Sequence, residues 1–124
     1  MILLTPEHRE RLLANGRDCD GDHVPVVKLF SPVGAATWLV TELDEDGDTL
    51  FGLADLGVGE PEMGSFSLSE ITSIRLPFGL SVERDLFFEG RFPLSVYADA
   101  ARLAGGIAGA EPLLRRIARE REGR

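Results

Sequence analysis

Three short apolar runs, each followed by a turn sequence, dominate the first half of the chain. They cover residues 24–30, 36–43 and 49–56, and the segments between them are rich in Pro, Gly and Asp. The middle run places alternate residues on opposite faces of an extended chain, which is typical of a strand. Two such runs joined by the Asp/Gly cluster at 44–48 favour an antiparallel hairpin.

Helix-start signals lie on both sides of this region. Thr5 followed by Pro6 and Glu7 predicts a helix over 6–14, closed by Asn15 and Gly16. The sequence Ser-Leu-Ser-Glu at 67–70 has the spacing of a capping box and predicts a helix of about two turns that ends near Arg75. The other expected elements are strands over 63–67 and 81–88, a helix after Pro93 and a last helix that starts at Pro112.

The length and order of these elements indicate one domain of the α+β class. A chain of 124 residues can bury its own core. With strands in the middle and helices at both ends, we expect a mainly antiparallel four- to five-stranded sheet with short helices packed on it. The single cysteine, the lack of a secretory signal and the lack of an apolar run of about 20 residues predict a cytoplasmic protein outside the membrane.

Charge is distributed unevenly along the chain, which has a formal net charge of −8. No Lys or Arg occurs between Lys28 and Arg75, whereas nine acidic residues do. Since nucleic acids are bound through Lys and Arg, we expect this segment to exclude nucleic acid and to face a protein partner with a basic surface. The predicted interaction residues are Glu42, Asp44, Glu45, Asp46, Asp48, Asp55, Glu60 and Glu62.

Other interpretations of the charged segments stay open. The acidic loops could serve solubility alone, or they could imitate a nucleic-acid backbone in an anti-defence role. The tail helix carries arginines, and we favour its docking on the acidic segment, within one molecule or in a homodimer, over fraying or contact with nucleic acid. Those arginines are Arg115, Arg116, Arg119, Arg121 and Arg124.

Candidate metal and catalytic residues have specific weaknesses. The acidic loops 18–22 and 44–48 have Gly at the fourth position, whereas a calcium loop of the EF-hand type needs it at the sixth. Cys19, His8 and His23 are too few for a structural zinc site. We therefore predict no metal and no cofactor.

A rival hypothesis is a small enzyme that uses the loop carboxylates of Asp55 and Glu62 for acid–base chemistry. Two other residues stand out in the apolar runs. Lys28 is expected to emerge at a sheet edge or to pair with an acid across a strand. Trp38 is expected in the core.

Several longer runs carry a resemblance to a known family; they include 25–30, 50–53, 60–64, Glu83-Arg84-Asp85 and 94–97. They lie within residues 1–103, and the chain resembles the bacterial domain-of-unknown-function family 2958 (DUF2958) there; residues 104–124 look like a helical extension of that core. The resemblance implies a small cytoplasmic protein, often encoded on mobile genetic elements beside DNA-handling genes, and it implies no catalytic residues. The leading hypothesis is therefore a non-enzymatic accessory protein.

Overall fold

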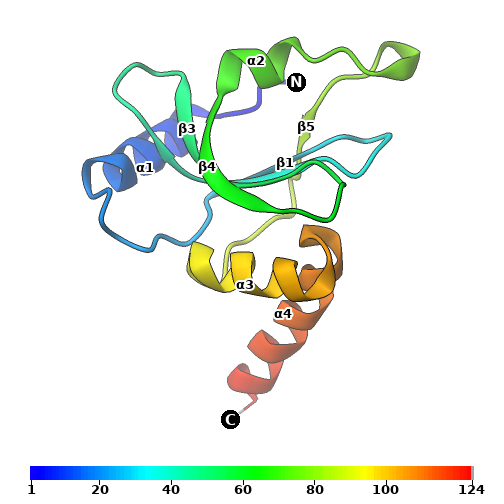
Figure 1. Ribbon diagram of the computed structural model, residues 1–124. Helices are drawn as coiled ribbons and strands as arrows, with labels where there is room; N and C mark the ends of the chain where they lie inside the picture. The colour runs from blue at the N-terminus through cyan, green and yellow to red at the C-terminus, as the bar shows by residue number, and fades with distance from the viewer. Residues whose placement is uncertain (124) are drawn as a thin grey trace.

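A five-stranded antiparallel sheet forms the centre of the molecule, whose computed structural model describes residues 1–123 (Figure 1). The spatial order of the strands is β4-β3-β2-β1-β5, so neighbours in sequence are neighbours in the sheet until the chain crosses to β5. The predicted α+β class is confirmed. The strands are β1 (Val27–Phe30), β2 (Thr37–Leu43), β3 (Thr49–Asp55), β4 (Glu62–Ser67) and β5 (Glu83–Arg84).

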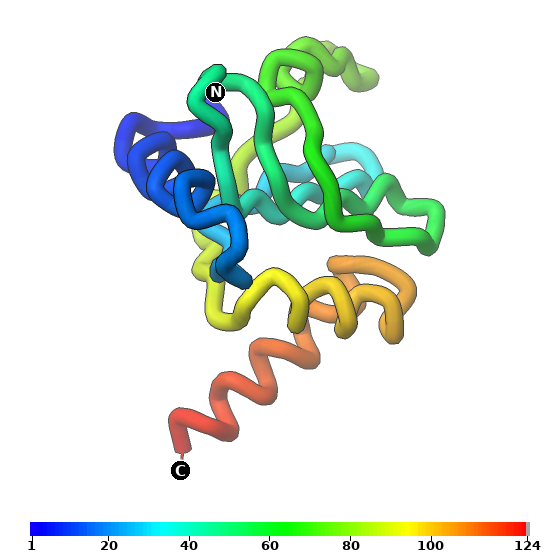
Figure 2. Tube along the Cα trace, turned by 60° about the vertical axis from the view of Figure 1, so that its left-hand side comes forward, coloured from blue at the N-terminus to red at the C-terminus, as the bar shows by residue number. Residues whose placement is uncertain are grey.

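Helices cover both faces of the sheet. Figure 1 and Figure 2 show α3 and α4 on one side of the sheet, with α4 extending away from it, and α1 and α2 on the other. None of the helices within residues 1–123 is long and apolar enough to cross a membrane. The helices are α1 (Pro6–Arg17), α2 (Leu68–Ser73), α3 (Leu94–Ala104) and α4 (Ile107–Glu122), and a short 3-10 turn covers Pro77–Gly79.

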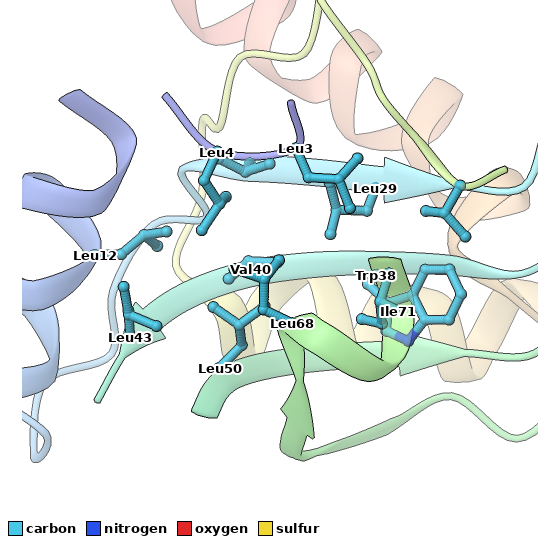
Figure 3. Close-up of a cluster of buried hydrophobic side chains, with 12 residues drawn as sticks. Leu3, Leu4, Leu12, Leu29, Trp38, Val40, Leu43, Leu50, Leu68 and Ile71 are labelled. Atoms are coloured by element: carbon cyan, nitrogen blue, oxygen red, sulfur yellow. The ribbon is translucent and has the colours of Figure 1, made fainter. Parts of the chain in front are cut away.

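Each face of the sheet has its own apolar core. Leu12 of α1 and Ile71 of α2 pack with Val40, Leu50 and Trp38 on the first face (Figure 3). The buried position of Trp38 confirms its expected place in the core. Burying a leucine or isoleucine side chain is worth about 1.5–3 kcal/mol, so these contacts hold α1 and α2 on the sheet.

The second core faces α3 and α4. Leu39 and Leu53 point toward this side of the sheet and pack with Tyr97 of α3 and Ile107 of α4. Since successive side chains of a strand alternate between faces, β2 and β3 supply both cores at once. This explains why their apolar runs are nearly continuous.

The ends of two helices depart from the predictions because of contacts distant in sequence. Helix α1 continues to Arg17, past the expected stop, since the Asn15 amide donates a hydrogen bond to the Thr41 carbonyl (2.9 Å). Helix α4 begins at Ile107, and Pro112 lies inside it. At the other end of α1, the predicted cap is confirmed, because the Thr5 hydroxyl accepts a hydrogen bond from the His8 N–H (3.1 Å).

The expected strand over 81–88 is wrong beyond Glu83 and Arg84. The Asp85 carboxylate accepts a hydrogen bond from the Phe87 N–H (2.9 Å), which turns the chain away from the sheet. Phe87 is consequently 95% exposed. An alternating apolar pattern does not form a strand where a side chain accepts the backbone hydrogen bond that a neighbouring strand would otherwise accept.

His8 should make the stability of the protein depend on pH between about 7.5 and 5.5. Its Nδ1 accepts a hydrogen bond from the Thr5 N–H (3.1 Å), which needs the neutral ring, and burial, followed by the charges of Arg84 and Arg11, lowers the pKa of His8 below 6.5. The unfolded chain therefore binds the proton first as pH falls, and the free energy of unfolding declines. Urea unfolding of the wild type and His8→Gln measures this, since glutamine accepts the same bond without titrating.

The difference between the two proteins isolates His8 from other titrating groups. Wild type should lose stability relative to His8→Gln as pH falls through this window. Parallel stability–pH curves for the two proteins would contradict the prediction.

Candidate interaction site

The fold divides the eight predicted interaction residues between the two ends of strand β3. We call Glu42, Asp44, Glu45, Asp46 and Asp48 the turn group, because they lie at or next to the β2–β3 turn. We call Asp55, Glu60 and Glu62 the loop group, since they lie at the β3–β4 end. Strand β3 has seven residues, so the two groups are about 20 Å apart along it. They do not form one continuous cluster.

Asp46 holds the β2–β3 turn together. Its carboxylate accepts hydrogen bonds from the N–H groups of Asp48 and Thr49 (2.8 Å each) and from the Thr49 hydroxyl (2.6 Å). These bonds, chiefly those from Thr49, lower the pKa of Asp46. The side chain is therefore both a structural part of the turn and a stable negative charge at its surface.

Asp48 joins the turn to the end of β4. Its carboxylate accepts hydrogen bonds from the Ser67 hydroxyl (2.7 Å) and from the Ser69 N–H at the start of α2 (2.8 Å). The Ser67 bond is the main reason that the pKa of Asp48 is lowered. The Ser67 hydroxyl in turn accepts from the Glu70 N–H (3.2 Å), as expected for the cap of α2, which ends at Ser73 before the predicted Arg75.

Glu42 and Asp44 line a hollow of about 210 Å³ beside the turn, whose wall also includes Cys19 and Phe51. Burial is the main cause that raises the pKa of Glu42; the charges of Asp44 and Asp18 act in the same direction, and His23 opposes them. Within residues 1–123, neither Glu42 nor Asp44 has a basic side chain in salt-bridge distance. Glu45, by contrast, pairs with Arg17 at the surface (2.8 Å).

Asp55 of the loop group is a structural residue. It is 4% exposed, and its two oxygens accept hydrogen bonds from the N–H groups of Gly57 (2.9 Å) and Ile107 (2.8 Å). Because Ile107 is the first residue of α4 and Gly106 supplies no side-chain cap, Asp55 caps this helix from the neighbouring strand.

Glu62 does not form a pair with Asp55. Its Cα partner on β3 is Ala54, which packs on the α1 and α2 face, whereas Asp55 points to the α4 face. Adjacent residues of a strand lie on opposite faces, so the two carboxylates are separated by the sheet. The acid–base pair of the rival enzyme hypothesis is not assembled, and Glu60 and Glu62 are both exposed.

The candidate metal ligands make other contacts or lie free at the surface. The His23 Nε2 is 2.6 Å from the Asp18 carbonyl oxygen, and Cys19 is an exposed free thiol. Asp22 accepts a hydrogen bond from the Ser95 N–H at the start of α3 (3.1 Å). No group of three or more His, Cys, Asp or Glu side chains in the described part of the chain is arranged to hold a metal ion.

Comparison with known proteins identifies a family. A family model described as a protein of unknown function (DUF2958) matches residues 3–108, which is most of the chain. The chain belongs to the DUF2958 family. No curated protein and no solved structure matches it. In this DUF2958 protein the matched region contains all five strands and ends just after α4 begins.

Lys28 forms a charged cluster with one acid from the neighbouring edge of the sheet and one from helix α4. Its ammonium lies 2.5 Å from the Glu111 carboxylate of α4 and 3.7 Å from the Asp85 carboxylate. The three side chains line a cavity of about 240 Å³ together with Phe88 and Tyr97. The expected cross-strand acid is Asp85, which follows β5 directly and whose N–H donates to the Lys28 carbonyl (2.9 Å). The nearer partner, Glu111, comes from a helix and was not predicted. The lone lysine in a buried strand and the single acid in the first turns of the last helix were the available signals.

The Arg-rich tail docks within the molecule, although not on the acidic segment. Arg121 lies over the Phe92 ring, with its guanidinium carbon 5.4 Å from the ring centroid, and Glu122 pairs with Arg91 (3.0 Å). The predicted docking on the acidic residues of the same molecule is therefore wrong for α4 through Glu122, whereas docking in a homodimer stays a prediction. Residue 124, the end of the expected extension, lies outside the described residues.

Proposed function

We propose that this DUF2958 protein is a non-enzymatic accessory protein that binds a protein partner with a basic surface through its turn group. The family resemblance further suggests that it serves mobile genetic elements. In one form of the proposal the carboxylates occupy a DNA-binding protein in place of phosphates. Asp55 is left out of the binding surface, because it is buried and both of its oxygens are engaged.

The hollow at Glu42 and Asp44 is the observation that supports this proposal most directly. Burial and neighbouring acids raise the pKa of the partly buried Glu42 carboxylate, which means that its charged form is destabilised. An arginine or lysine brought into the hollow would remove that destabilisation. A cationic side chain from a partner therefore gains more here than at a fully solvated carboxylate.

The surrounding charges support the same function. Hydrogen bonds lower the pKa values of Asp46 and Asp48, so both remain ionised at neutral pH. Exposed charges of one sign speed the association of an oppositely charged protein, and this effect weakens as salt is added. A basic partner would thus be drawn to the turn group before it contacts the hollow.

Neutralising the hollow should remove partner binding while the fold is retained. The test variant is Glu42→Gln/Asp44→Asn, which spares the structural carboxylates of Asp46 and Asp48. Its matched control, Glu120→Gln/Glu122→Gln, removes the same charge from exposed positions on α4. Tagged copies of both variants and of the wild type are used to recover bound proteins from a bacterial lysate, at low and at high salt.

A protein bound by the wild type and the control should be lost from the hollow variant, with at least a tenfold weaker affinity when it is purified, which equals about 1.4 kcal/mol. Duplex DNA should compete for it if the acids stand in for phosphates. Equal binding by the two variants, or binding that persists at high salt, would refute the proposal.

A further inference from the structure

Strand β4 has one free side along its whole length. It is the last strand of the sheet and, within residues 1–123, pairs with β3 alone, without a register shift. In Figures 1 and 2 no other segment of the described chain runs beside its outer side. Proteins usually protect such an edge with lysine, proline, a bulge or a covering segment. β4 has none of these between Glu62 and Ser67.

The hydrogen-bond pattern identifies the free backbone groups. The Thr49 carbonyl accepts from the Asp44 N–H (2.8 Å), so the backbone of Thr49 faces β2. In an antiparallel sheet the direction alternates from residue to residue, and the β4 partners of Leu50, Gly52 and Ala54 are therefore bonded to β3. The N–H and C=O groups of Met63 and Ser65 consequently point outward.

The surface beside these groups has room for another chain. Met63 is 45% exposed, and Ser65 is exposed as well. A Cβ atom placed on Gly64 would meet no atom within 4 Å. An added strand would therefore find open hydrogen-bonding groups, an apolar contact at Met63 and no steric barrier at Gly64.

Acidic residues lie at both ends of this edge. Glu60 and Glu62 lie at its start, and Asp48 is bonded to Ser67 at its end. No Lys or Arg occurs in residues 60–67, and the nearby Arg102 pairs with Asp99 (3.2 Å). The edge thus connects the loop group with the turn group and is complementary to a strand that carries positive charge at both ends.

We propose that the free edge of β4 binds an extended segment of the basic protein partner by β-strand addition. The proposal rests on the function proposed above and specifies how that partner is held. Backbone bonds to Met63 and Ser65 provide the pairing, and a basic residue at each end of the segment contacts the acids there. Glu60 and Glu62 at one end of β4 and Asp48 at the other, which are separate on the surface, would then serve one ligand.

The probe is a synthetic peptide of about nine residues, long enough to span β4, with arginine at both ends and alternating valine and threonine between them. Binding to the full chain is followed by amide NMR. We expect saturable shifts centred on Met63 and Ser65, and at least tenfold slower hydrogen exchange of these two amides in the complex. Serine in place of both terminal arginines should weaken binding about tenfold.

Ser65→Pro provides the decisive variant. It removes an outward N–H while leaving the β3 pairing intact, and proline is tolerated on edge strands at such positions. It should weaken peptide binding at least tenfold, whereas Ser65→Ala should bind as the wild type does. If Ser65→Pro does not fold, peptides N-methylated at alternate residues test the same contact, because only the set facing β4 should lose affinity.

The outcomes separate this inference from the proposed function. If the partner recovered from lysate is lost from the Glu42→Gln/Asp44→Asn variant yet binds Ser65→Pro normally, strand addition is refuted and the proposed function stands. Ser65 also lines the hollow, so Met63 distinguishes the two sites. Absence of saturable shifts, shifts of the hollow without Met63, or a concentration-dependent dimer that pairs β4 with β4 in place of the peptide would also refute strand addition.

Discussion

Replacing Lys28 by methionine should lower the free energy of unfolding by about 3 kcal/mol. The Lys28 and Glu111 side chains are only 16% and 13% exposed, and removing one member of a buried ion pair leaves the other charge without compensation. In this protein two carboxylates, those of Glu111 and Asp85, would then share a cavity without the lysine between them. Urea unfolding followed by the fluorescence of the single, buried Trp38 measures the loss.

The double variant Lys28→Met/Glu111→Leu is the control for this prediction. It removes both charges and keeps apolar volume in the cavity, so it should recover about 2 kcal/mol of the loss, since well-packed apolar residues can replace a buried ion pair at little cost. A loss below about 1 kcal/mol in Lys28→Met would show that water already screens the pair.

Replacing Asp55 by alanine should lower the free energy of unfolding by about 3 kcal/mol. The change leaves the buried N–H of Ile107 without an acceptor and removes a negative charge from the start of α4. Urea unfolding gives the total effect. Hydrogen exchange locates it, because amides in the first turn of α4 should exchange at least tenfold faster.

Two further variants test whether the loss of stability comes from the capping contacts of Asp55. Asp55→Asn should lose an intermediate amount, since its single carbonyl oxygen can accept from Gly57 or from Ile107 but not from both as the carboxylate does. Glu62→Ala, at the same end of the sheet but exposed, should change stability by less than about 0.5 kcal/mol. Equal stability of Asp55→Ala and Glu62→Ala would contradict the capping role.

Features with local signals could be predicted from the sequence. Thr5 and Ser67 cap their helices through residues three positions away, so their sequence spacing contains the information. The strands before residue 68 are short apolar runs between turn residues, and their order follows from the short links. These features account for the correct fold class.

Features that depend on contacts between residues distant in sequence could not be predicted. Asn15 extends α1 because of a carbonyl on β2, and Lys28 is neutralised by a glutamate 83 residues away. The prediction that the acidic residues form one interaction surface failed for a related reason. Asp48 and Asp55 are close in sequence, but the strand between them carries them to opposite ends of the sheet, and burial gives Asp55 a structural task.

The unequal length of the two outermost strands limits how copies of this molecule can aggregate. Unlimited stacking of sheets into a fibre requires a long open strand on each side of every subunit. Here β4 has six residues, whereas β5 has two and leads directly into the chain turn at Asp85. Pairing between copies through β4 therefore stops at two molecules, because the two-residue β5 on the far side of each sheet is too short to pair with a further copy.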